Sequence, residues 1–181
     1  MNLICLDSHY FLWGILERAE PDQLHMIPKA KAFFRKLDET KAIIVVPTPL
    51  ITELLMKSDP SEREKIMTTL KQRCYVKEFG VLAAKIAADI WNAKTNTGLI
   101  EELKKSGVSM RTKIKVDTQI LAVAMVANAV TLYTEDEKLQ RLADGYLIVS
   151  SMPEITETPE LFSQANPAFQ QNAPSEPLPP S

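Results

Sequence analysis

The chain has 181 residues, of which 45% are hydrophobic, and its formal net charge at pH 7 is -2. This length and composition predict one domain with a core of its own. The mildly acidic balance excludes a generic polyanion-binding protein, so any contact with nucleic acid has to come from a local basic patch. No uninterrupted apolar segment is long enough to span a membrane and no basic leader opens the chain, so we expect a soluble cytoplasmic protein.

The first predicted element is a short apolar run at residues 3–6 that stops at Asp7, where a helical pattern begins. This predicts a central strand that ends in a carboxylate. Residues 28–37 have the spacing of an amphipathic helix. Residues 42–46, with the sequence AIIVV, have the composition of a second buried strand.

A helix is predicted after the second strand, because Thr48 followed by Pro49 is an N-cap and first-turn proline signal. Glu53 lies one helical turn into this helix, beside its apolar stripe. Asp59 before a proline repeats the signal for a helix that runs to about residue 72. Residues 74–79 then predict a third, edge-like strand.

Two helices are predicted next, at residues 81–93 and 99–104. Residues 106–115 are polar and basic and predict a loop just ahead of Asp117. The cations of this loop are Arg111, Lys113 and Lys115.

The stretch from residue 113 to 143 organises the rest of the chain. Asp117 stands where the first turn of a helix is expected, and residues 129–133 have the length and composition of a buried strand. Thr134 and Asp136 follow this strand, ahead of a second helical pattern. Helix, strand and helix in succession indicate a parallel sheet, in which ligands bind beyond the carboxyl ends of the strands.

The last predicted strand is at residues 146–149. From Pro153 onward apolar residues become sparse and prolines accumulate, ending in PSEPLPPS. Such a segment cannot bury enough apolar surface to fold alone. We therefore expect a domain of residues 1–152 and a flexible tail of residues 153–181.

Four acids follow strands or belong to the helices beside them, and in a right-handed parallel sheet such positions can converge on one edge: Asp7, Glu53, Asp117 and Asp136. Clustered carboxylates repel one another unless a cation neutralises them. Mg²⁺ and Mn²⁺ prefer oxygen ligands, and two such ions about 3.5–4 Å apart can activate a water and stabilise the leaving oxygen of a phosphodiester. The set predicts a divalent-metal site.

The sequence around these acids resembles the acidic motifs of the PIN-domain nucleases. The segments are ICLDSHYFLW around Asp7, VPTPLITELL around Glu53, KVDTQILAVAMVANAV around Asp117, and LYTEDEKL around Asp136. The resemblance runs from residue 2 to residue 149, and the size is similar to that of VapC-type toxins of bacterial toxin–antitoxin modules. It implies a three-layer α/β/α sandwich with a mainly parallel five-stranded sheet.

The same resemblance implies a Mg²⁺- or Mn²⁺-dependent endoribonuclease with an RNA substrate, a cognate antitoxin as inhibitor and a homodimeric state. The four acids would be its catalytic metal ligands, and Thr134 the hydroxyl that orients Asp7 or a metal-bound water. Residues 153–181 are not covered by the resemblance. The helical material between residues 79 and 115 is longer than in the most compact members.

Simpler roles compete with these. Asp7 and Asp117 are also placed to cap helices, and Glu53 has the alternative of an ordinary solvated helix residue. Asp136 competes with Glu135 and Glu137, and the pattern Thr-x-Asp is the reason for choosing it.

The cations of the predicted loop have two interpretations of equal weight. They hold an RNA backbone next to the acids, or they belong to an ordinary solvated loop. His9 follows Asp7 closely, but a lone histidine without a partner is more often incidental, and it is not included in the predicted site.

Two other functions stay open. One is a non-catalytic PIN-like module that binds RNA or protein, against which the complete set of acids argues. The other is a phosphatase-type hydrolase with Asp7 as nucleophile, which usually has a second acid two residues on, where this chain has His9.

Overall fold

The structure is a computed structural model that describes residues 2–105 and 110–155. Its centre is a five-stranded sheet with the order β3-β2-β1-β4-β5, in which every neighbouring pair runs parallel. The strands are β1 (Leu3–Leu6), β2 (Ile43–Pro47), β3 (Cys74–Lys77), β4 (Thr131–Tyr133) and β5 (Ile148–Ser150). The five-stranded parallel sheet is the one that the sequence predicted.

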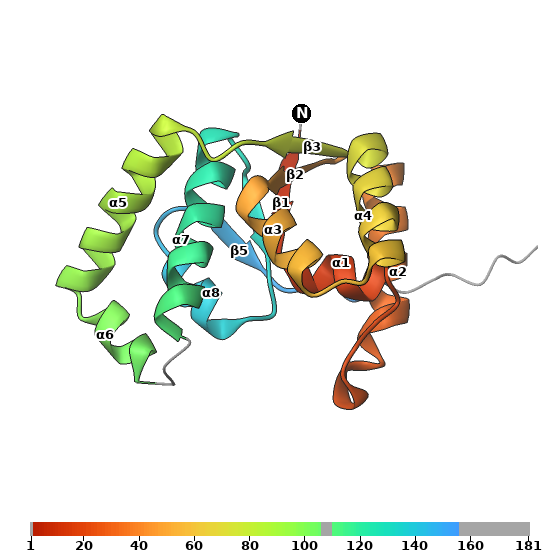
Figure 1. Ribbon diagram of the computed structural model, residues 1–181, viewed down its shortest axis with the longest axis horizontal. Helices are drawn as coiled ribbons and strands as arrows, with labels where there is room; N and C mark the ends of the chain where they lie inside the picture. Colours follow the sequence, from red (N-terminus) through yellow and green to blue (C-terminus); the bar gives the residue numbers. More distant parts are fainter. Residues whose placement is uncertain (1, 106–109, 156–181) are drawn as a thin grey trace, which may run out of the picture.

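Helices cover both faces of this sheet. They are α1 (Ser8–Gly14), α2 (Met26–Glu39), α3 (Thr48–Met56), α4 (Pro60–Arg73), α5 (Val81–Asn96), α6 (Leu99–Lys104), α7 (Met110–Val126) and α8 (Glu137–Ala143), with a short 3-10 helix at Pro21–Gln23. In Figure 1, α1, α2 and α4 lie on one side of the sheet and α5 to α8 on the other. The predicted three-layer α/β/α sandwich is therefore confirmed, and α3 contacts helices of both layers, α1 and α7.

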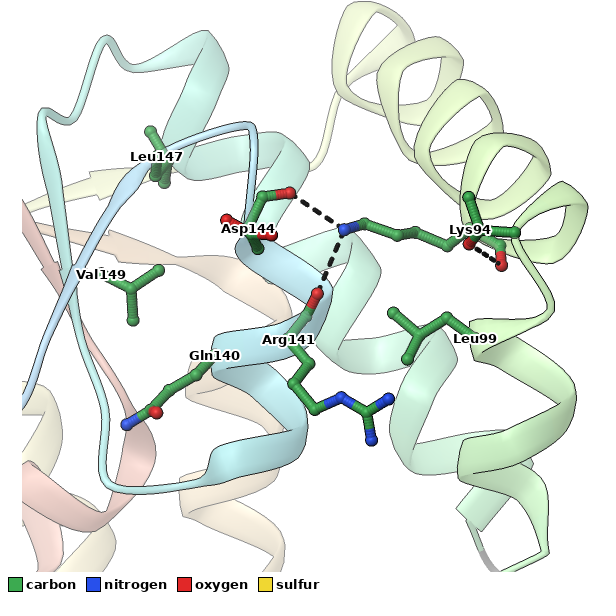
Figure 2. A pocket seen from close by; sticks show the side chains of 8 residues that line it. Lys94, Leu99, Gln140, Arg141, Asp144, Leu147 and Val149 are labelled. Atoms are coloured by element: carbon green, nitrogen blue, oxygen red, sulfur yellow. Dashed lines mark hydrogen bonds between the residues drawn. The ribbon is translucent and has the colours of Figure 1, made fainter.

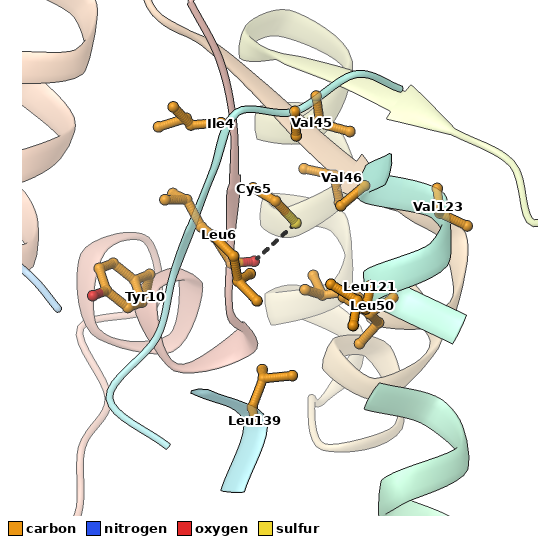
Figure 3. Close-up of a cluster of buried hydrophobic side chains, with 14 of the residues drawn as sticks. Ile4, Cys5, Leu6, Tyr10, Val45, Val46, Leu50, Leu121, Val123 and Leu139 are labelled. Atoms are coloured by element: carbon orange, nitrogen blue, oxygen red, sulfur yellow. Dashed lines mark hydrogen bonds between the residues drawn. The ribbon is translucent and has the colours of Figure 1, made fainter. Parts of the chain in front are cut away.

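The core lies between these layers and is centred on β1 and β2. Cys5 and Leu6 of β1 are fully buried, as are Val45 and Val46 of β2, and Figure 3 shows them packed with Leu121 of α7. Strands covered on both faces have no solvent side, so their sequences are continuous apolar runs and not alternating ones. This is why LICL and IIVVP were readable as strands from composition alone.

The sheet also decides where the candidate site lies. β1 pairs with β2 on one side and with β4 on the other. Because all strands are parallel, their carboxyl ends share one edge, and the segments that follow them start there. Asp7 directly follows β1, and Thr134 directly follows β4. The backbone N–H of Asp7 donates a hydrogen bond to the Tyr133 carbonyl (3.0 Å), which connects the ends of the two strands.

The basic segment ahead of Asp117 is not a loop. α7 begins at Met110, so Asp117 lies in the middle of the helix and not in its first turn. The physical reason is that Met110 and the buried Ile114 extend the apolar stripe by one turn, and lysine and arginine are good helix formers. Residues 106–109 of the predicted loop lie outside the described residues.

Thr48 does not cap α3 as predicted. It is the first residue of the helix, Pro47 is the cap, and the Thr48 hydroxyl accepts the backbone N–H of Phe79 at 3.1 Å. This side chain therefore ties α3 to the segment after β3. Asp59, by contrast, caps α4 with a full capping box, as the sequence indicated.

The described part of the predicted tail contacts the domain. Glu154 forms an ion pair with Lys29 of α2 at 2.7 Å, and Ile155 packs against the core. Residues 156–181 lie outside the described residues. Within the described ranges, no helix has the length and apolar character that crossing a membrane requires.

The close packing of α1 on α2 gives a first prediction. A Cβ at Gly14 would lie 2.5 Å from the ring of Phe34, which is buried and packs edge-on to Phe11. Gly14→Ala should therefore lower the free energy of unfolding by about 1–3 kcal/mol in urea titrations. Gly80→Ala is the control, since an added Cβ there meets nothing within 4 Å. Equal stability of the two variants would contradict this packing.

Candidate functional site

Asp7 follows β1 directly and caps α1. Its Oδ1 accepts the backbone N–H of Ser8 at 2.6 Å, and its Oδ2 accepts the hydroxyl of Thr134 at 2.9 Å. The Nδ1 atom of His9 lies 3.3 Å from the same Oδ2. Burial raises the pKa of Asp7, but the hydrogen bonds from His9, Thr134 and Ser8 outweigh burial and hold that pKa below its ordinary value. Asp7 is therefore a buried carboxyl group whose hydrogen-bond partners favour its ionised form.

Thr134 connects two of the predicted acids. Its buried hydroxyl donates to Asp7 and accepts the backbone N–H of Asp136 at 3.0 Å. Asp136 in turn caps α8, with its Oδ1 accepting the backbone N–H of Lys138 at 2.8 Å. The Thr134 hydroxyl thus lies where it orients Asp7.

The two acids that compete with Asp136 have other surroundings. Glu135 accepts the Tyr10 hydroxyl at 3.0 Å and the backbone N–H of Met152 at 2.7 Å, so it joins α1 to the chain after β5. Glu137 is exposed in the first turn of α8. Of the three, Asp136 is the one whose backbone N–H donates to the Thr134 hydroxyl and whose carboxylate contacts Lys113.

Asp117 is as deeply buried as Asp7, with 7% of its surface exposed. Burial raises its pKa to about 7, and the like charges of Asp7, Asp136 and Glu53 add to this shift against the opposing charge of Lys113. Four carboxylates from four separate elements therefore share one electrostatic environment. The roles of the four acids as metal ligands stay predictions.

Two lysines neutralise part of this negative charge. The Lys113 ammonium donates to Asp136, and the charges of Asp136, Asp117 and Asp7 raise its pKa although burial opposes them. Lys57 pairs with Glu53 one turn away on α3, at 2.8 Å. The chain's own ammonium groups therefore occupy the positions beside two of the four acids.

The donor chemistry fits a hard divalent cation, because every predicted ligand is a carboxylate. Within residues 2–105 and 110–155, however, no three His, Cys, Asp or Glu side chains are grouped closely enough to hold an ion as they stand. The ammonium group of Lys113 contacts a carboxylate oxygen of Asp136, and that of Lys57 contacts one of Glu53.

Three residues were not predicted from the sequence as partners of the acids: His9, Lys57 and Lys113. Lys57 and Lys113 each lie four residues from a predicted acid, Glu53 and Asp117, which is the spacing of side chains stacked on one helix face. This spacing was the available signal. For His9 the signal was its position two residues after Asp7.

The three predicted substrate-binding cations do not act as one patch. They lie on α7, where a helix turns by about 100° per residue, so Lys113 points toward the acids while Arg111 and Lys115 are exposed on another face. A common role in binding a substrate stays a prediction for Arg111 and Lys115.

A pocket of about 570 Å³ lies between α5, α8 and β5, apart from the acids (Figure 2). The charged side chains that line it have structural roles. Lys94 reaches across it and donates to the carbonyls of Arg141 (3.1 Å) and Asp144 (2.9 Å), which caps the carboxyl end of α8. Arg141 forms a two-pronged ion pair with Glu102. The charged side chains around this pocket thus hold α5, α6 and α8 together. None of the four acids lines the pocket.

No family model and no curated protein matches the chain. Solved structures with a similar fold include VapBC2 from Rickettsia felis bound to a DNA fragment from their promoter (TM-score 0.58, 17% identity, 83% of this chain and 99% of that chain). They also include DNA-bound VapBC from Salmonella typhimurium (0.57, 14%, 84% and 100%) and FitAcB from Neisseria gonorrhoeae (0.50, 18%, 81% and 95%).

These comparisons correct the family assignment made from the acidic motifs. Identities of 14–18% show a shared fold alone, and no family model supports more. The neighbours are VapBC assemblies on DNA and FitAcB, and the likeness does not identify this chain with the nuclease component. The assignment to PIN-domain nucleases and VapC-type toxins is therefore withdrawn, while the α/β/α fold stands.

The raised pKa of Asp117 predicts a pH-dependent cost to stability. Between about pH 4 and pH 7 the unfolded chain loses the Asp117 proton while the folded chain keeps it, so stability falls as pH rises through this window. Asp117→Asn removes the ionisation and should raise the free energy of unfolding at pH 8 by on the order of 2–4 kcal/mol, with little gain at pH 4.

Urea unfolding from pH 4 to pH 8 in EDTA measures this difference. Asp89→Asn, on the exposed face of α5, is the matched control for the loss of one carboxylate. A gain for Asp117→Asn that is the same at pH 4 and pH 8 would rule out the buried ionisation.

Proposed function

We propose that this chain is an endoribonuclease that hydrolyses RNA phosphodiesters with Mg²⁺ or Mn²⁺ as its cofactor. The observation that supports it is the burial of the Asp117 carboxyl group at a place where the charges of Asp7, Asp136 and Glu53, from other elements, act on it. Placing like charges together inside a fold costs stability, so packing alone gives no reason for the arrangement. A bound divalent cation would offset that cost, and the acids would then have a catalytic role as its ligands.

In this proposal Asp7, Asp117 and Asp136 hold the metal and Glu53 supports them from α3. When bound, the ion would polarise a phosphoryl oxygen and lower the pKa of a bound water. Thr134 keeps the Asp7 carboxylate in one orientation through its 2.9 Å hydrogen bond.

The lysines have a second task in the same proposal. In this structure Lys113 contacts Asp136 and Lys57 contacts Glu53. With a metal bound to the acids, these two ammonium groups would be free to contact phosphates of the substrate, and such contacts position a nucleic acid without reading its bases. The chain itself offers charge and orientation, and no side-chain nucleophile is required.

We also propose that the chain works within a toxin–antitoxin system as its RNA-cleaving component. All three structural neighbours are toxin–antitoxin complexes, and two of them are bound to DNA. Their similarity in fold supports the setting, with a small DNA-binding protein as the partner of this chain.

Cleavage of a labelled single-stranded RNA in Mg²⁺ or Mn²⁺ tests the nuclease proposal. Asp7→Asn and Asp117→Asn should each lower the rate by roughly 100-fold or more, because losing a partner of a metal ligand already costs 10–100-fold. Thr134→Val should fall in that smaller range. Circular dichroism verifies that each variant is folded.

Asp89→Asn is the control and should cleave at the unaltered rate, since it lies exposed on α5. Full metal-dependent activity in Asp7→Asn or Asp117→Asn would refute the proposed site. Absence of cleavage and of Mn²⁺ binding in the unaltered chain would favour a non-catalytic binding module.

A growth assay tests the toxin–antitoxin setting. Expression of the chain in bacteria should arrest growth, Asp7→Asn should not, and co-expression of the small protein encoded next to it should restore growth. Arrest by Asp7→Asn as strong as by the unaltered chain would separate toxicity from the acidic site and contradict this proposal.

A further inference from the structure

A pocket of about 360 Å³ lies beside the acidic site, between α1 and the segment that follows it. Its lining includes His9, Leu12, Trp13, Arg18, Gln23 and Lys57. Two of these residues touch the acids directly, since His9 lies 3.3 Å from Asp7 and Lys57 lies 2.8 Å from Glu53. The pocket and the acidic site therefore share a wall.

One side of the pocket is aromatic and rigid. The rings of His9 and Trp13 lie 5.5 Å apart with an angle of 33° between their planes. Trp13 is buried and packs on Tyr10, which fixes its position, whereas the His9 side chain is 37% exposed. A planar ligand thus meets a partly exposed ring that is backed by a fixed one, which is how single-stranded RNA bases are bound.

The other side carries two cations, an amide and one carboxylate, that of Glu20. The Arg18 guanidinium is held by Glu62 at 3.0 and 3.1 Å and by the Lys57 carbonyl at 2.8 Å, so its place at the rim is fixed. The Lys57 ammonium adds a second positive charge. The side-chain amide of Gln23 can both donate and accept hydrogen bonds, as reading the edge of a base requires.

We propose that this pocket binds one nucleobase of a single-stranded RNA, that of the nucleotide next to the phosphodiester at the acids. The inference rests on the proposed nuclease function and adds a specificity subsite to it. The volume is in the range of small-ligand sites, about 300–1,000 Å³. An aromatic wall with two cations at its rim matches a base together with its phosphate.

The probes are the four nucleoside 5′-monophosphates, with ribose 5-phosphate as the base-free control. The chain has two tryptophans, so in Trp91→Phe the fluorescence reports Trp13 alone. We expect at least one nucleotide to quench Trp13 with a dissociation constant about fivefold or more below that of ribose 5-phosphate, because stacking of a base contributes roughly 1–3 kcal/mol. Equal quenching by ribose 5-phosphate, or none by any nucleotide, overturns the proposal.

Paired variants locate the binding. In the Trp91→Phe chain, His9→Ala should weaken nucleotide binding about fivefold or more, and Gln23→Ala should change which base is preferred. The chain has one other histidine, and His25→Ala is the matched control because His25 is exposed and does not line the pocket. Nucleotide binding unchanged in both His9→Ala and Gln23→Ala shows that the base binds elsewhere and refutes the pocket.

The two proposals fail separately. Metal-dependent RNA cleavage without nucleotide binding at Trp13 refutes the base pocket and leaves the nuclease. Nucleotide binding that His9→Ala weakens, without any metal-dependent cleavage, supports the pocket and refutes the nuclease.

Discussion

Negative charges that meet inside a fold must be balanced by positive charge, and this constraint shapes the edge of the sheet where β1 and β4 end. Burial and three neighbouring carboxylates raise the pKa of Asp117 to about 7. The ammonium of Lys113 contacts Asp136, and that of Lys57 contacts Glu53. The chain thus supplies from α7 and α3 the cations that its own acids need. The negative charge at this edge is therefore partly balanced by side chains of the chain itself.

The topology of the fold places these acids near one another. β1 lies between β2 and β4, so residues that follow these three parallel strands emerge side by side. α7 crosses against β2 and α3, which brings Asp117 to the same edge from the opposite layer. One buried hydroxyl, that of Thr134, then links Asp7 to the backbone of Asp136. Burial of the continuous apolar strands beneath the acids offsets the stability that burial of the acids costs.

Much of this could be predicted from the sequence because its signals are local. The strands at β1 and β2 are apolar runs, Asp59 begins α4 with a proline, and parallel topology follows from the alternation of strand and helix. The start of α7 could not be placed, because its polar first turns resemble a loop until Ile114 is seen to be buried. With the helix misplaced, Lys113 was assigned to substrate and not to the acids.

The family assignment was wrong for a different reason. The acidic motifs are a few residues each and are separated by long segments, so they do not define a family by themselves. At 14–18% identity the similar structures share the fold and leave the family open. The features that point to a function are those of the site: the charge balance around Asp117, and the aromatic pocket that His9 connects to Asp7.

Diffraction from crystals soaked in Mn²⁺, recorded at the manganese absorption edge, shows whether these acids bind a divalent ion. We expect an anomalous peak in contact with carboxylate oxygens of Asp7 and of Asp117 or Asp136, with the Lys113 ammonium moved away from Asp136. A site without such a peak, in which Lys113 still contacts Asp136 at saturating Mn²⁺, would show that the acids do not form a metal site.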